Sequence, residues 1–249
     1  MGYTRVLRTA TSTLEHTFDV DETATDSSTP VTVTVTDANG TPVTAPGTAT
    51  SAGAGTGRYT LALAGQPLVA LLTVAWSATI AGASVVETDT VEIVGGFFFT
   101  LREGRSSDSS LSDTGKYPTA KLITTRLETE AECEEICDRA FVPRYGRAVL
   151  DGTGTGELLL AGDNDIRSIR AVRVAPRVGE TFVALTAGEL AALTVTRDRV
   201  LLRTDGAIWT EERSNVIVEY EHGLTIPPED LKRATLVRFK ARLNIDKTN

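Results

Sequence analysis

The chain has 249 residues, of which 41% are hydrophobic and 23% charged, a composition typical of a globular protein with one large or two ordinary domains. Its formal net charge of −8 argues against a dedicated nucleic-acid binder, and no apolar run reaches the roughly 18 residues of a membrane span. The N-terminus, MGYTRVLRTATSTLEHTFDVD, lacks the apolar core of a secretory signal, so we expect the protein to be made in, and to stay in, a cytoplasm.

Residues 17–94 show almost only β-strand signals. Valines alternate with threonines over residues 31–36 and lead into Asp37-Ala38-Asn39-Gly40, a strong hairpin-turn sequence. Further apolar runs are separated by glycine-rich turns and lie at 58–63, 68–80 and 83–94. Roughly six or seven short strands, with turns about every ten residues, predict an immunoglobulin-like (Ig-like) β-sandwich over residues 1–96. This region contains no cysteine, which is typical of a reducing compartment.

The composition changes at Gly95-Gly96. An aromatic group at 97–99 is followed by the polar stretch REGRSSDSSLSDTGK, so we predict a flexible linker over residues 97–116, with an ordered functional arm as the alternative. The charge also divides at this point. Nine acidic and three basic residues give residues 1–96 a net charge of −6, whereas 24 acidic and 22 basic residues give residues 97–249 a net charge of −2.

Residues 117–249 predict an α+β domain. Pro118 opens a long helix whose apolar stripe faces inward and whose glutamates face outward, and Pro143 ends it. Short apolar segments between residues 157 and 221 predict a small antiparallel or mixed sheet. A second amphipathic helix follows Pro227-Pro228, with acids in its first turn and cations along its body.

Residues that carry chemistry are sparse in this sequence. Cys133 and Cys137 lie four apart on one predicted helix, which is a poor geometry for a disulfide, so we interpret both as small buried hydrophobes. His16 and His222 lie too far away to complete a metal site, and no serine has a nucleophile-elbow context. The stretches GAGTG and GTGTG match no phosphate-binding motif. We therefore expect no catalytic residue, no metal and no cofactor.

Two stretches carry a resemblance to a known family. They are AECEEICDRAFVPRYGRAVLDG at 131–152 and NVIVEYEHGLTIPPEDLKRATLVRFKARL at 215–243. Together with the segment Phe99 to Gly104 and with Tyr117-Pro118, in this order and spacing, they resemble the head-to-tail connector, or adaptor, proteins of long-tailed phages that infect actinobacteria. The resemblance runs from about residue 97 to the end of the chain.

The resemblance implies a structural protein of the virion neck, assembled in the host cytoplasm. Its subunits are expected to form a ring, twelve-fold by this resemblance, beneath the portal protein. Such a ring extends the DNA channel towards a head-closure protein and the tail, so its partners are itself, the portal, a neck protein and, non-specifically, the packaged DNA. No enzyme activity, cofactor or membrane contact is implied.

Two sets of residues are candidates for the contacts of such a ring. The C-terminal helix is expected to dock onto the portal through Leu231, Lys232, Leu236, Phe239, Lys240 and Leu243. The alternative is that this helix packs wholly on its own domain. The contact between subunits is expected to use Glu128, Glu132, Glu135, Arg139, Arg144 and Arg147. The alternative is that these arginines only solvate their own surface.

Two other functions stay open on the sequence. The chain is alternatively a tail or baseplate component with an Ig-like module, which a virion copy number far above one ring would favour. It is alternatively a surface adhesin or carbohydrate-binding protein. The missing secretory signal argues against that last function, as does the presence of a single tryptophan, Trp209, that we expect to be exposed.

Overall fold

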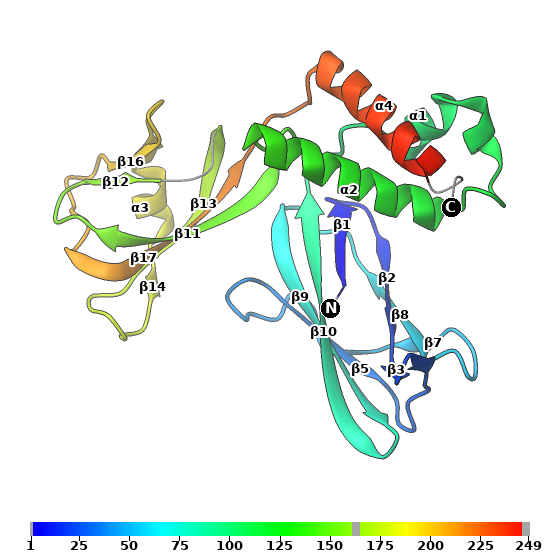
Figure 1. Ribbon diagram of the computed structural model, residues 1–249. Helices are drawn as coiled ribbons and strands as arrows, with labels where there is room; N and C mark the ends of the chain where they lie inside the picture. Colours follow the sequence, from blue (N-terminus) through cyan, green and yellow to red (C-terminus); the bar gives the residue numbers. More distant parts are fainter. Residues whose placement is uncertain (1, 161–164, 246–249) are drawn as a thin grey trace. The chain divides into compact units, whose positions relative to one another are not determined.

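The computed structural model describes residues 2–160 and 165–245, and the chain divides into two compact units (Figure 1). Unit 1 comprises residues 1–95 and unit 2 comprises residues 96–249. The division therefore falls within the predicted Gly95-Gly96 seam.

Unit 1 consists of β-strands. Its five-stranded sheet has the order β1-β10-β9-β5-β6, a three-stranded sheet has the order β2-β8-β7, and β3 pairs with β4. Strand β1 runs parallel to β10, and every other pairing is antiparallel. The strands are β1 (Tyr3–Leu7), β2 (Ser12–Thr17), β3 (Asp19–Val20), β4 (Thr23–Ala24), β5 (Thr32–Thr36), β6 (Gly47–Thr48), β7 (Thr50–Ser51), β8 (Arg58–Leu63), β9 (Ala70–Ile80) and β10 (Ala83–Val94).

The core of unit 1 lies between its two larger sheets. Inward side chains of β9 alternate with outward ones, as the period of a strand requires. Trp76 on β9 is fully buried, and it shares one hydrophobic cluster with Leu14 on β2 and Leu63 on β8. Because residues of both sheets meet in this cluster, the sheets face each other across a common core. The predicted all-β character of the first region is confirmed.

Residues 97–116 do not form the predicted linker. They contain helix α1 (Leu101–Ser106) and a 3-10 turn η1 (Ser109–Ser112). Thr100 and Glu103 form a capping box at the start of α1, and Phe98, Phe99 and Leu111 are buried. The segment is polar because its serines, threonine and acids make caps and turns, while a few apolar side chains anchor it.

Three helices share one hydrophobic cluster in unit 2. Helices α2 (Thr119–Cys137) and α4 (Glu229–Ile245) pack against each other, and α1 lies against α2. Phe239 of α4 stacks edge-on against Phe99, with ring centroids 5.1 Å apart, and Leu122 of α2 is completely buried in the same cluster. The long helix predicted after Pro118 and the C-terminal helix are both confirmed. The predicted faces of α2 are wrong at two positions, because Glu130 is buried and Ile136 is exposed.

The rest of unit 2 is a β region with its own core. A four-stranded antiparallel sheet has the order β11-β17-β13-β14, and a three-stranded one has the order β12-β16-β15. Trp209 is fully buried in the cluster that these strands share, so its predicted exposure is wrong. The elements are β11 (Arg144–Gly152), β12 (Glu157–Leu159), β13 (Ile166–Val174), β14 (Val183–Ala184), α3 (Ala187–Ala191), β15 (Leu193–Val195), β16 (Val200–Arg203) and β17 (Glu212–His222).

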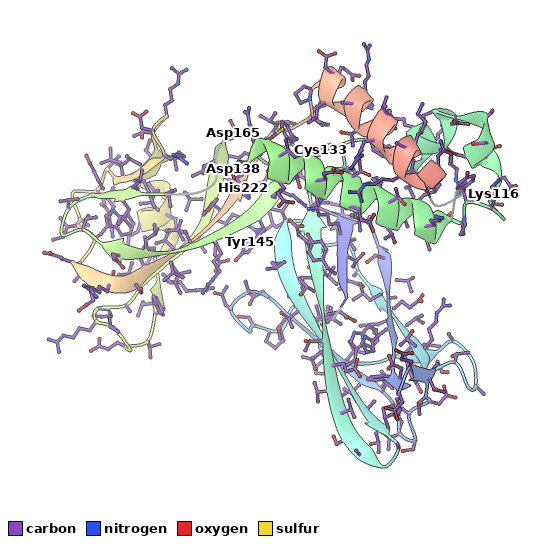
Figure 2. The ribbon with its side chains drawn as sticks, in the orientation of Figure 1. Lys116, Cys133, Asp138, Tyr145, Asp165 and His222 are labelled. Carbon is purple, nitrogen blue, oxygen red and sulfur yellow. The ribbon has the colours of Figure 1, made fainter. Side chains whose placement is uncertain are left out.

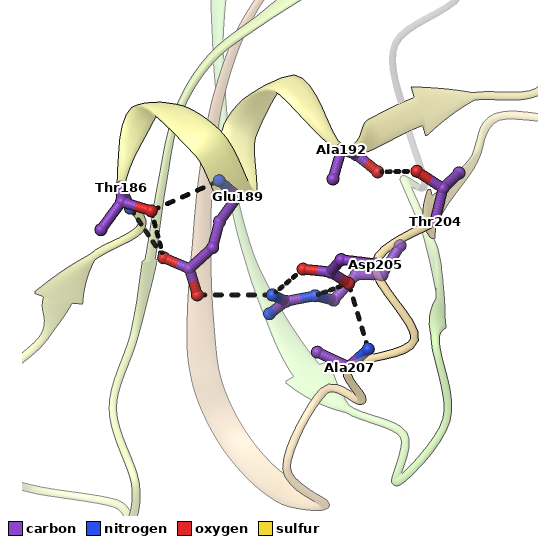
Figure 3. Close-up of polar contacts among 7 residues, drawn as sticks. Thr186, Glu189, Ala192, Thr204, Asp205 and Ala207 are labelled. Carbon is purple, nitrogen blue, oxygen red and sulfur yellow. Dashed lines mark hydrogen bonds and ion pairs between the residues drawn. The ribbon is translucent and has the colours of Figure 1, made fainter.

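A polar network ties the short helix α3 to β16 (Figure 3). Thr186 and Glu189 form a capping box at the start of α3, and Arg203 donates to Glu189 at 3.4 Å and to Asp205 at 2.6 Å. The Arg203 guanidinium also lies 5.2 Å from the ring centroid of Trp209. Hydrogen bonding by Arg203 lowers the pKa of Asp205 to about 2. These groups stabilise one another, so we assign them a structural role.

Candidate interaction surfaces

The best-defined polar feature of unit 2 is the seam between α2 and α4. Glu132 accepts hydrogen bonds from Arg238 at 2.8 Å and from Arg242 at 2.9 Å, and Glu128 accepts one from Arg242 at 2.9 Å. Hydrogen bonds from Arg238 and then Arg242 lower the pKa of the Glu132 carboxyl. Glu128 and Glu132 of α2 are therefore already neutralised by a helix of the same chain.

Glu135 differs from the other predicted acids of the subunit contact. It is exposed on α2, and no ion pair of its carboxylate is found within residues 2–160 and 165–245. Glu128 and Glu132, in contrast, are committed to Arg238 and Arg242. Of the three acids, Glu135 is the one whose charge is left for a partner.

The predicted arginines of the subunit contact divide in a similar way. Arg144 is buried and pairs with Glu134, and Arg139 pairs with Asp165 at 2.7 Å, near the end of α2 where Figure 2 labels Asp138 and Asp165. Arg147 is exposed on β11, opposite Glu219 of β17. Arg139 and Arg144 thus form ion pairs within their own unit, and Arg144 is buried instead of solvating the surface.

The predicted portal-docking residues lie mostly on the inward side of α4. Phe239 and Leu243 are buried in the helical cluster, and Leu231 and Leu236 pack against it. The ammonium group of Lys232 pairs with Glu103, and that of Lys240 donates to the Ser107 carbonyl at 3.2 Å. The helix therefore packs on its own unit, and these six side chains do not form a free docking surface. An apolar helical stripe marks a buried face, but it does not say what buries that face.

The pair of Lys232 and Glu103 was missed in the sequence. Lys232 donates to Glu103, and the backbone N–H of Thr100 donates to the same carboxylate at 2.7 Å. These bonds lower the pKa of Glu103 to about 2, with the Lys232 bond as the largest cause. The pattern Thr-x-x-Glu at 100–103 was a readable capping signal. Its lysine partner lies 129 residues away and carries no sequence signal.

Unit 1 has a polar cluster of its own around His16. The imidazole Nδ1 lies 2.7 Å from Asp89 Oδ2, its Nε2 lies 3.1 Å from Glu87 Oε2, and the ring stacks on Trp76. These residues line a cavity of about 490 Å³. His16 is on β2 and both carboxylates are on β10, so the cluster links the two sheets of the unit.

The described residues show neither a metal centre nor a membrane span. No group of three or more His, Cys, Asp or Glu side chains with metal-binding geometry occurs in residues 2–160 and 165–245. In the same ranges, no helix is long and apolar enough to cross a membrane. Cys133, labelled in Figure 2, is partly buried and faces α4, but Cys137 is exposed, so the prediction that both are buried is wrong for Cys137.

Comparisons with known proteins give a distant structural likeness. The chain matches no protein-family model and no curated protein. It is similar to a chain in a structure described as "Neck of empty GTA particle computed with C6 symmetry", with 16% sequence identity and a TM-score of 0.38. The match covers 48% of this chain and 64% of that one, so this chain spans less than two thirds of the neighbour's length. A TM-score of this size does not establish a shared fold.

Proposed function

We propose that this chain is a head-to-tail connector of a phage neck, with copies that form a ring beneath the portal. The observation that carries the proposal is that the two stretches with the family resemblance, 131–152 and 215–243, come together in space. Strand β11 pairs with β17 from Arg144 opposite His222 to Leu150 opposite Val216, and α2 packs on α4. Motifs more than 60 residues apart therefore belong to one structural module, as a shared family origin would require.

The rest of the chain agrees with a structural role. The proposal assigns no catalytic step, cofactor or metal, and most of the charged side chains described above are engaged with one another in pairs and caps. Function then lies in interfaces, where buried area and a few anchoring side chains set affinity. A twelve-fold ring, contact with the portal and contact with a head-closure protein belong to this proposal.

Unit 1 is proposed to be an Ig-like β-sandwich at the periphery of the ring. Two sheets sharing one core are what such a sandwich requires, and the net charge of −6 over residues 1–96 is unsuited to lining a DNA channel. Virions that lack residues 1–94 should still join heads to tails. Loss of joining while the shortened protein remains folded would contradict the peripheral position.

The experiment that tests the proposed function is localisation in the virion. Particles labelled with an antibody to this protein should carry the label at the neck, and quantitative mass spectrometry should find the copies of a single ring per particle. Label along the tail or at the baseplate, or a copy number many times larger, would favour the tail-component alternative instead.

A further inference from the structure

The outward face of α4 is different from the face that the sequence singled out. Ala234, Val237 and Ala241 recur at helical spacing and are exposed, and Val237 is 64% exposed. Arg233, one turn before Val237, is exposed on the same face, and no ion pair of its guanidinium is found in the described part of the chain. The outward face therefore carries small apolar side chains at its centre and a positive charge near its start.

The outward face of α2 has the complementary character. Thr124, Glu128, Ala131 and Glu135 recur at helical spacing and are exposed, and Glu128 is paired with Arg242 of the same chain. Two of them are small, so a neighbouring helix can approach closely, and Glu135 places a negative charge near the end of the helix. One helix therefore presents a protruding valine with an arginine, and the other presents an alanine with a glutamate.

Inside the chain, α2 and α4 already show how two such helices pack. As the residue number on α2 falls, the number of its partner on α4 rises, so the helices are antiparallel. The contacts that fix this register are Cys133 with Thr235, Glu132 with Arg238, and Glu128 with Arg242. Ion pairs border this seam, and Thr235 and Phe239 are fully buried on α4.

The two outward faces match each other in that same register. If α4 of one copy lay antiparallel on α2 of another copy, in the register that places Cys133 opposite Thr235 in the internal pair, three complementary pairs would form. They are Arg233 with Glu135, Val237 with Ala131, and Asn244 with Thr124. In this register Cys137, the last residue of α2, lies opposite Leu231, so the overlap begins at Leu231.

We propose that the outward face of α4 docks on the outward face of α2 in a second copy of this chain. The contact is heterologous, since each copy uses a different face towards each neighbour. Contacts of this kind generate a ring when the rotation between neighbours closes, and a filament when it does not. The inference rests on the proposed function, which requires a ring, and it names the helices that build the ring. It also places the subunit contact on α4, whereas the sequence predicted that Arg139 and Arg144 take part in it.

The first test compares two valines of equal exposure. Val237 on α4 and Val183 on β14 are each 64% exposed, so aspartate at either position costs little in an isolated subunit. Val237→Asp should weaken assembly of the full chain by about thirtyfold or more, as loss of a central interface anchor does. Val183→Asp should leave assembly unchanged. The measurement is the mass distribution by sedimentation velocity and native mass spectrometry, with circular dichroism as the check on folding.

The second test exchanges the charges of the proposed ion pair. Arg233→Glu and Glu135→Arg should each weaken assembly by about twofold to fivefold, the range of an exposed ion pair, and the double variant should restore it. Rescue by the double variant identifies the two residues as partners, which a general effect of surface charge does not produce.

The possible outcomes separate this inference from the proposed function. Rings formed by the wild-type chain and equally well by Val237→Asp would overturn the α4–α2 contact while leaving the connector function intact. A wild-type chain that stays monomeric at every concentration, alone and with portal-bearing heads, would overturn both. Rings lost equally in Val237→Asp and Val183→Asp would place the contact elsewhere.

Discussion

Unit 1 and the helical part of unit 2 are held together by different forces. Unit 1 has an apolar core between two sheets, centred on the fully buried Trp76. In the helical part, a smaller apolar cluster is bordered by ion pairs from α4 to α1 and α2, such as those of Glu103 and Glu132. Both regions should respond to packing changes, and the ion pairs that border the smaller helical cluster should give the helices a larger share of stability that depends on pH and salt.

The largest effect is expected from shortening α4. Truncation after Thr235 removes Phe239 and Leu243, both buried in the helical cluster, and each large side chain of this kind contributes roughly 1.5–3 kcal/mol. The ion pairs of Arg238 and Arg242 are lost as well. We expect the helical part to unfold, seen as lost helical signal in circular dichroism. A truncated chain that keeps the helical signal of α1 and α2 would show that α4 is dispensable for the fold.

A smaller effect, confined to one unit, is expected from Trp76→Ala. The substitution leaves a large cavity between the sheets and should destabilise unit 1 by about 3–5 kcal/mol. We predict that the units fold independently, so the melting transition of unit 2 should not move. As a control, residues 1–95 and 96–249, which are the two units, should each melt cooperatively when expressed separately. One transition that shifts as a whole would show that the units are coupled.

Acid should weaken the helical part through Glu103. Its pKa of about 2 in the folded chain lies below the ordinary value of 4.5, so the stabilisation is complete above about pH 4.5 and is lost as the pH falls towards 2. Glu103→Gln keeps a side chain suited to the capping box but removes the charge, and should cost about 0.5–1 kcal/mol at pH 7. The measurement is urea unfolding at pH 7 and pH 3. An equal loss at both pH values would contradict this origin.

The smallest effect is expected from Glu128→Gln. The carboxylate of Glu128 is half exposed and pairs with Arg242, which keeps its second bond to Glu132. We expect a loss of about 0.2–0.5 kcal/mol that disappears at about 1 M salt, where exposed charges are screened over a few ångströms. Denaturant midpoints at low and high salt measure it. A loss that persists at high salt would indicate packing instead of charge.

The sequence predicted the elements well where a long periodic pattern existed. The helix after Pro118, the strand before His222 and the C-terminal helix were all identified by period and by capping residues. The prediction failed for residues 97–116, because a few buried side chains in a polar segment leave no periodic signal. The sequence also did not reveal which apolar residues of α4 are buried in the core and which face outward. Phe239 and Val237 are both apolar, and only the packing shows that Phe239 is buried and Val237 exposed.

The parallel pairing of β1 with β10 has a consequence for handling the protein. Tyr3 to Leu7 cover the edge of β10 from Thr90 to Val94. A chain that begins at Arg8 would leave the backbone N–H and C=O groups of that edge without their strand partner, and unpaired edges of this kind recruit strands from other molecules. Shortened forms of unit 1 that start beyond this strand should therefore be prone to aggregate, even though most of the core residues are retained.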